Sequence, residues 1–179
     1  MKAVMKSVSP RICEKVANGD CTILVSKTAP KCGAPFNGYI YCTFPKKPAY
    51  TLWLNRGTEN KFLADGKVIG EFVCDKIDEY TSNERGWYCY DLETCLLCDE
   101  IAGYGKGKTL YGWHISDLKI YDKPKEFSEF YTIDESGSDC CIACVYHETP
   151  LEEMPCRTCT GERRYLYRPP QSWCYVEEI

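Results

Sequence analysis

Apolar and polar residues alternate in short runs along most of the chain, and turn-forming residues such as glycine, proline and asparagine separate these runs. Alternation with a period of two is typical of β-strands that bury one face. The runs that predict strands are residues 2–8, 21–26, 39–43, 67–74, 110–121 and the segment after residue 168. Gly70, inside one of these runs, indicates a β-bulge. The pattern therefore favours a β-barrel-like sheet.

Two segments carry helical signals instead. Ser9, which is followed by proline, suits the N-cap of a helix that runs to about Val16, and Gly19 suits the stop after that helix. Residues 91–102 have helical spacing, with Asp91 as the cap, and the glycine-rich stretch after them ends this second helix. Both predicted helices are short.

The remaining segments are predicted as turns and loops. Residues 45–66 contain prolines around a small apolar patch, and we interpret them as an excursion between strands, with a hairpin as one option. Residues 122–125 suit a turn and residues 128–139 suit a loop. Together these elements predict an α+β fold built on a partly open β-barrel with two or more short helices.

Length and composition narrow the class of protein. A chain of 179 residues has the size of one domain and can bury a core. The N-terminal segment lacks the apolar stretch of a secretory signal, and no apolar run reaches the roughly 18 residues of a spanning helix. We therefore expect a cytoplasmic protein with no membrane partner, in which most of the 14 cysteines are free thiols. Cys13, Cys42 and Cys74 lie in apolar stretches, where free cysteine acts as a small buried hydrophobe.

Charge is divided unevenly along the chain. The net charge is −4 at pH 7, and residues 131–179 contain four arginines, no lysine and nine acidic residues. The strong basic excess that usually marks a binder of long nucleic acid is absent. Any contact with nucleic acid is therefore expected to be local. The acidic C-terminal region could instead engage a protein partner.

Paired cysteines near the C-terminus give the strongest chemical signal in the chain. The four residues concerned are Cys141, Cys144, Cys156 and Cys159, which form two CxxC pairs separated by eleven residues. This spacing lets four thiolates surround one Zn²⁺ ion tetrahedrally, which predicts a structural zinc site with no open coordination position. Cys140 and His147 are alternative ligands for one of the positions. A third pair, Cys95 and Cys98, falls in the predicted second helix, where inert thiols are favoured over a redox or metal role.

Several segments resemble the ASCH domains of the PUA-like superfamily, in particular the small ASCH-type proteins of Firmicutes and their phages. The similar segments are the turn at residues 18–23, the strand at 67–72, residues 110–126, and the C-terminal residues 169–177. The resemblance implies a PUA-like, partly open barrel formed by residues 1–130 and 168–179. Residues 131–167 would then be a cysteine-rich insert similar to a zinc knuckle.

The resemblance also implies a cleft for RNA or a modified nucleotide beside the early helix–strand turn. The residues expected to contact this ligand are Cys21, Thr22, Lys27, Thr28, Trp113 and Trp173. The two tryptophans could stack on bases, and each such stack is worth about 1–3 kcal/mol. Packing in the core is the competing interpretation for each tryptophan.

One bacterial ASCH branch, the acetylcytidine amidohydrolases, carries the motif G-x-K-T-x-T-x-R at this turn. In this chain the motif falls on residues 19–26, where Cys21, Leu24 and Ser26 replace its lysine, its second threonine and its arginine. That activity is therefore not expected to transfer.

Two further hypotheses stay open. A hydrolase acting on a modified nucleoside would need other catalytic groups, and the candidates are Lys27, Glu71 and His114. A hydrogen-bonded structural role is the competing interpretation for His114, and an exposed surface carboxylate is the simpler one for Glu71. The third hypothesis is a phage or host protein-interaction module that uses the acidic C-terminal region.

Overall fold

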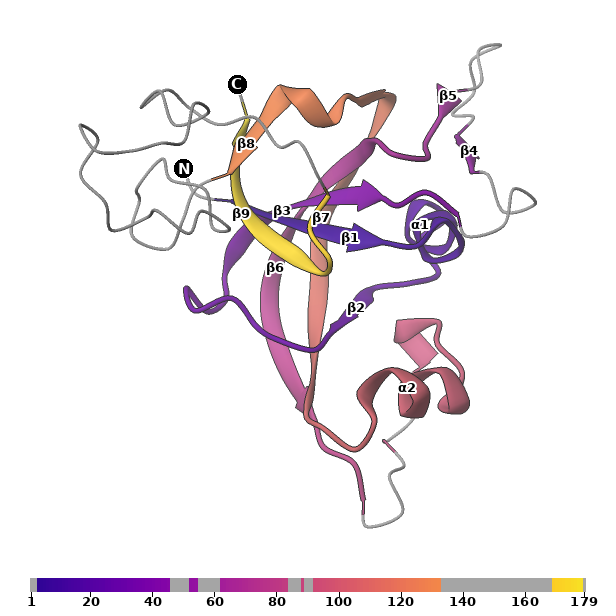
Figure 1. The fold of residues 1–179 in the computed structure, drawn as a ribbon, viewed down its shortest axis with the longest axis vertical. Helices are drawn as coiled ribbons and strands as arrows, with labels where there is room; N and C mark the ends of the chain where they lie inside the picture. The colour runs from indigo at the N-terminus through magenta and orange to yellow at the C-terminus, as the bar shows by residue number, and fades with distance from the viewer. Residues whose placement is uncertain are drawn as a thin grey trace, which may run out of the picture.

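The computed structural model describes residues 3–45, 52–54, 62–83, 88, 92–132 and 169–178. These residues form a seven-stranded sheet, a two-stranded sheet and two α-helices (Figure 1). The helices are α1 (Pro10–Ala17) and α2 (Cys98–Gly105), with short 3-10 helices η2 (Leu92–Thr94) and η3 (Phe127–Glu129). The strands are β1 (Ala3–Val8), β2 (Ile23–Ser26), β3 (Phe36–Cys42), β4 (Trp53–Leu54), β5 (Phe62–Leu63), β6 (Val68–Tyr80), β7 (Leu110–Lys125), β8 (Phe130–Thr132) and β9 (Trp173–Glu178).

The large sheet has the strand order β2-β7-β6-β3-β1-β9-β8. The β1–β3 pair is parallel, and the other five pairs of neighbours are antiparallel. In this order β2 and β8 are the edge strands, so the described part of the sheet is open and not closed into a barrel. The α+β class predicted from the sequence is confirmed.

The two faces of the sheet bury different sets of side chains. Val4 and Val8 of β1 join the larger core cluster, which includes the buried side of α1, whereas Ala3 and Met5 join a smaller cluster on the other face. This division follows from the alternation of side chains along a strand. Each fully buried aliphatic side chain stabilises the folded state by roughly 1.5–3 kcal/mol relative to an exposed one. Lys6 has the same parity as Val4 and Val8, so the strand points a lysine into the larger cluster.

Helix α1 begins and ends where the sequence predicts. Pro10 stands in its first turn, and Ile12, Cys13 and Val16 are buried on one face. Gly19, just beyond the end of the helix, has a φ of 80°, in the left-handed region that glycine adopts readily. Helix α1 therefore packs on the sheet directly after β1.

The predicted continuous helix over residues 91–102 is wrong. The chain forms η2, turns at Cys95, and begins α2 only after Leu97. Cys95 has a φ of 53°, outside the range of an α-helix, and its Sγ donates a hydrogen bond to the carbonyl of Asp20 at 3.2 Å. Such contacts with the turn before β2 outweigh the helical propensity of residues 91–102, and the helix is interrupted at Cys95. The Cys95–Cys98 pair thus spans the break between two short elements.

The predicted turn at residues 122–125 is also wrong, because β7 continues through it. In the pairing of β7 with β6, Ile120 lies opposite Gly70 and Lys125 lies opposite Val68. Residues 121–124 of β7 therefore bulge out of the ladder. Pro124 lies in this bulge, where a missing N–H donor is tolerated. The bulge predicted at Gly70 is confirmed by the register shifts on both of its neighbouring strands. Part of the predicted loop after residue 127 forms η3 and β8 instead.

The cysteines predicted as core residues are confirmed. Cys13, Cys42 and Cys74 are free and fully buried. Burial raises the pKa of the Cys74 thiol to about 12 and that of Cys13 well above its usual value, so both are protonated at neutral pH. None of the helices in the described ranges is long and apolar enough to cross a membrane.

Candidate functional site

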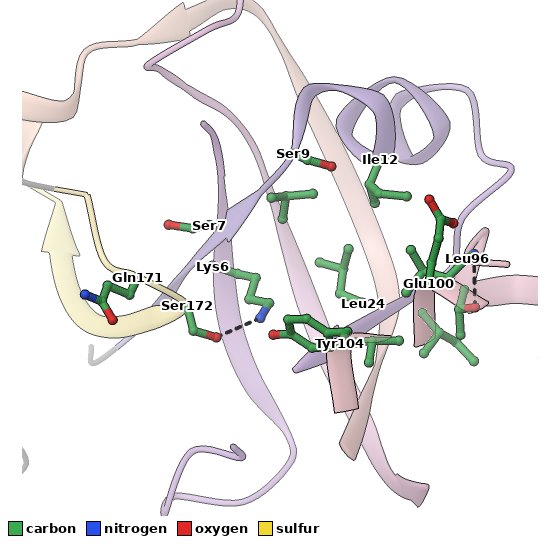
Figure 2. Close-up of a pocket in the computed structure, with 14 residues that line it drawn as sticks. Lys6, Ser7, Ser9, Ile12, Leu24, Leu96, Glu100, Tyr104, Gln171 and Ser172 are labelled. Atoms are coloured by element: carbon green, nitrogen blue, oxygen red, sulfur yellow. Dashed lines mark hydrogen bonds between the residues drawn. The ribbon is translucent and has the colours of Figure 1, made fainter. Parts of the chain in front are cut away.

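A cavity of about 320 Å³ opens beside β1, between the start of α1, the strand β2, the α2 region and the segment before β9 (Figure 2). We call it the Lys6 cavity. Its lining residues are Lys6, Ser7, Val8, Ser9, Ile12, Ile23, Leu24, Val25, Thr94, Leu96, Glu100, Tyr104, Gln171 and Ser172. Apolar walls with a few placed polar groups are typical of sites for small molecules.

Lys6 is the central polar group of the cavity. Its side chain is only 4% exposed, and its Nζ donates a hydrogen bond to Ser172 Oγ at 3.2 Å (Figure 2). The ammonium also lies 5.1 Å from the centre of the Trp113 ring, a cation–π distance. Within the described part of the chain, no carboxylate forms an ion pair with it. Burial without a counterion lowers the pKa of Lys6 to about 7.

The segment before β9 closes the cavity by docking onto β1. The Ser7 amide donates to the carbonyl of Ser172 at 2.8 Å, and Ser7 Oγ donates to the carbonyl of Pro170 at 2.6 Å. Ser172 Oγ also lies 3.2 Å from Ser26 Oγ on β2. Ser172 therefore joins three segments that are far apart in the sequence, and it holds the acceptor for Lys6 in place.

The opposite wall comes from the α2 region. Glu100 is already engaged, because Oε1 accepts from Arg11 at 2.7 Å and Oε2 accepts from the Leu97 amide at 2.8 Å. Burial raises the pKa of Tyr104, although hydrogen bonds from Ser172 and the Lys27 backbone act in the opposite direction. Tyr104 is thus a neutral phenol at pH 7. The cavity therefore offers a ligand a cation, several hydroxyls and a carboxylate that is held by other groups.

Three of the residues predicted to contact a ligand lie near the cavity. The Lys27 ammonium lies 4.6 Å from the centre of the Tyr104 ring. Trp173 is half-buried, and its Nε1 donates to Thr28 Oγ1 at 2.8 Å and to the Thr28 carbonyl at 3.2 Å. Since Tyr104 and the residue before Trp173 line the cavity, these side chains belong to its surroundings.

The other predicted contact residues lie deeper or further out. Trp113 is completely buried against Phe36 and Trp173, and its Nε1 has no hydrogen-bond partner among the described residues. Cys21 is buried, and its thiol donates to the carbonyls of Ile23 and Thr94. Thr22 is exposed and directly precedes β2. None of the three is among the residues that line the Lys6 cavity.

The candidate catalytic residues Glu71 and His114 are held in other interactions. Glu71 accepts from Lys119 Nζ and from the Tyr121 hydroxyl, each at 2.9 Å, and the Lys119 bond is the main cause that lowers the pKa of Glu71. His114 Nε2 lies 2.7 Å from Asp78 Oδ2. Neither side chain lines the Lys6 cavity, so the structure does not bring Lys27, Glu71 and His114 together.

The predicted zinc ligands Cys141, Cys144, Cys156 and Cys159 lie outside the described residues, as do the alternative ligands Cys140 and His147. Within the ranges that are described, no cluster of three or more histidine, cysteine or acidic side chains could hold a metal ion. The zinc site stays a prediction.

The sequence contained signals for the residues that our prediction missed. Lys6 stands at a position of β1 whose neighbours at i−2 and i+2 are valines, and a lysine with core parity is unusual. Ser172 belongs to the C-terminal segment that resembles the ASCH proteins, but a sequence does not reveal which strand that segment meets. Tyr104 could not be found, because the helix that carries it was placed wrongly.

The described residues define an α+β protein in which an open mixed sheet and two short helices surround a small cavity. No model of a known protein family matches the chain. No curated protein matches it in sequence. Among solved structures, the chain is similar to an ASCH protein from Zymomonas mobilis, with 16% identity and a TM-score of 0.48 over 69% of this chain and 73% of that chain.

A point mutant of the same Zymomonas mobilis protein matches with a TM-score of 0.50 and 16% identity, over 70% of this chain and 76% of that chain. At this identity the likeness concerns the fold. The fold of this chain is therefore similar to that of this ASCH protein, as the resemblance in sequence predicted, and the sheet that the described residues form is open.

Proposed function

We propose that this protein binds RNA or a modified nucleotide and that one nucleotide unit enters the Lys6 cavity. The observation that carries the proposal is the cavity itself, because it combines a buried ammonium with hydroxyls and apolar walls. Its volume of about 320 Å³ lies at the lower end of the range for small-molecule sites, which suits a single nucleotide unit better than a longer segment.

The surroundings of the cavity support the same ligand class. Tyr104 supplies an aromatic ring in the lining, and Lys27 adds a cation beside that ring. An aromatic ring can stack on any base, and an adjacent cation favours a backbone phosphate. The near-neutral first 130 residues fit a local contact with a short single-stranded or nucleotide ligand.

Calorimetry at low salt with short single-stranded RNAs, nucleosides and mononucleotides tests this function. We expect at least one of these ligands to bind with a Kd below about 1 mM. Tyr104→Leu should weaken binding about tenfold, whereas Tyr104→Phe, which keeps the ring, should retain it. No binding by any of the ligands would overturn the proposed function.

Hydrolysis of a modified nucleoside is a second candidate, favoured by a pKa of about 7 for an amine inside the cavity. Neutral Lys6 could take a proton from water as the water oxygen adds to an acyl carbon. It could then pass that proton to the amine nitrogen as the C–N bond breaks. Release of product from acylated nucleosides, lost in Lys6→Met, would support this activity. Release that survives the substitution would exclude this role for Lys6.

We also propose that residues 131–167 bind one structural Zn²⁺ through Cys141, Cys144, Cys156 and Cys159. The spacing of the two CxxC pairs supports this proposal. Protein purified without chelator should contain about one zinc per chain by atomic absorption, because a structural ion stays bound. A metal content below about 0.3 per chain would contradict it. A protein partner for this acidic region stays a prediction.

A further inference from the structure

The Lys6 ammonium is buried and has no charged partner within the described chain. Its Nζ has three N–H donors, and the acceptor that the structure gives it is the neutral hydroxyl of Ser172. An ammonium kept away from water without a counterion is costly, and an anion that enters the cavity would relieve that cost. The buried lysine thus indicates that the ligand is negatively charged and that its charge lies beside Lys6.

The start of α1 provides a second set of donors at the same cavity. Ser9, its N-cap residue, and Ile12 both line the cavity, and the Ser9 side chain makes no capping hydrogen bond. Pro10 has no N–H, so the amides of Arg11 and Ile12 are the first donors of the helix that lack an intrahelical acceptor. Together with the helix dipole, such amides favour an anion.

The other charged and titratable groups around the cavity do not supply the missing negative charge. The Glu100 carboxylate is bound by Arg11 and by the Leu97 amide. Tyr104 is a neutral phenol, and Lys27 beside it adds positive charge. The net character of this site is therefore cationic, although the whole chain is acidic.

From this geometry we infer that the Lys6 cavity is a phosphate-binding site, in which a terminal phosphate monoester lies between Lys6 Nζ and the N-terminus of α1. The inference rests on the proposed function and narrows it. The ligand would be a nucleoside monophosphate or a phosphorylated RNA end, and a neutral nucleoside would bind more weakly. Ser9 and Ser172 would supply hydroxyl contacts beside the phosphate.

Calorimetry with three probes tests the inference: cytidine, cytidine 5′-monophosphate and inorganic phosphate, at low salt and pH 7. A hydrogen bond to a charged group is stronger than one between neutral groups, so the monophosphate should bind at least about tenfold more tightly than cytidine. Lys6→Met should remove that difference and abolish phosphate binding. Lys76→Met removes an equal charge from an exposed side chain paired with Asp78, and it should change neither result.

The possible results separate the inference from the proposed function. Equal affinity for cytidine and its monophosphate, or monophosphate binding that Lys6→Met leaves intact, would overturn the phosphate site while nucleoside binding still stands. Phosphate binding that depends on Lys6, without binding of any nucleoside, nucleotide or RNA, would support the phosphate site and overturn the proposed function. Circular dichroism spectra that match the wild-type spectrum establish that each variant is folded.

Discussion

Lys6 occupies a strand position whose neighbours two residues away, Val4 and Val8, are buried in the core. Because side chains alternate along a strand, this position forces the lysine inward. An aliphatic residue would pack there at lower cost, since burial of an uncompensated charge destabilises a fold. Lys6 thus lowers the stability of the fold and also gives the cavity its charge. Functional sites commonly contain residues that lower stability in this way.

Lys6→Met should therefore stabilise the protein. The folded-state pKa of about 7 lies below the ordinary value of 10.5, so below pH 7 the full cost of a buried ammonium is present. Between pH 7 and 10.5 the unfolded state holds more protons than the folded state, and the free energy of unfolding rises with pH. We expect the substitution to add about 2–4 kcal/mol at pH 7 and much less at pH 10.

Urea denaturation of both proteins at these two pH values measures the effect. Lys76→Met is the matched control, because Lys76 is exposed, and it should change stability by less than about 0.5 kcal/mol. If Lys6→Met raises the free energy of unfolding by the same amount at both pH values, the charge of Lys6 does not destabilise the protein.

Ser172→Ala should act through Lys6. The substitution removes the acceptor of the ammonium and the hydroxyl next to Ser26, so we expect a loss of about 1–3 kcal/mol at pH 7. In the Lys6→Met background the loss of unfolding free energy caused by Ser172→Ala should be smaller by about 0.5–2 kcal/mol, because the charge that the hydroxyl stabilises is gone. Chemical denaturation of the four proteins completes this double-mutant cycle, and additive effects would argue against the Lys6–Ser172 interaction.

At the scale of elements, β1, α1, β2, β3 and the bulge at Gly70 could be predicted from the sequence. Their signals are local: alternation of apolar residues, a proline in the first turn of the helix, and a glycine after its end. The break at Cys95 and the continuation of β7 past Pro124 could not be predicted in this way. Both depend on pairing with segments that lie far away in the chain.

The bulge at Gly70 gives a prediction at this scale. A Cβ added there would lie 2.5 Å from the carbonyl oxygen of Lys119, which is backbone and cannot swing away. We expect Gly70→Ala to lower the free energy of unfolding by about 1–3 kcal/mol because β6 and β7 must separate to admit it. Thermal unfolding measures the loss.

Gly103→Ala is the control for this experiment. Gly103 lies inside α2, and a Cβ there meets no atom within 4 Å. Alanine is the better helix former, so this variant should gain about 0.5–1 kcal/mol. Gly70→Ala with wild-type stability would contradict the close approach of the two strands.

At the scale of the whole molecule, the sheet joins segments from both ends of the chain. β1 pairs with β3 on one side and with β9 on the other (Figure 1). The segment before β9 closes the Lys6 cavity. The cavity is therefore formed by residues near the N-terminus, from the α2 region and near the C-terminus. This assembly explains why the sequence pointed to the right neighbourhood, around residues 27 and 28, but not to Lys6, Tyr104 and Ser172.

Amide NMR of the ¹⁵N-labelled protein shows directly whether a phosphorylated ligand binds in the Lys6 cavity, when the protein is titrated with cytidine 5′-monophosphate and then with a short RNA that carries a 5′-phosphate. We expect the largest shift changes at residues that line the Lys6 cavity, including Lys6, Ser9, Ile12, Tyr104 and Ser172. In Lys6→Met the same shift changes should require at least about tenfold more cytidine 5′-monophosphate. Shift changes centred elsewhere, for example around Glu71 and Lys119 or around His114, would show that the ligand binds outside the Lys6 cavity.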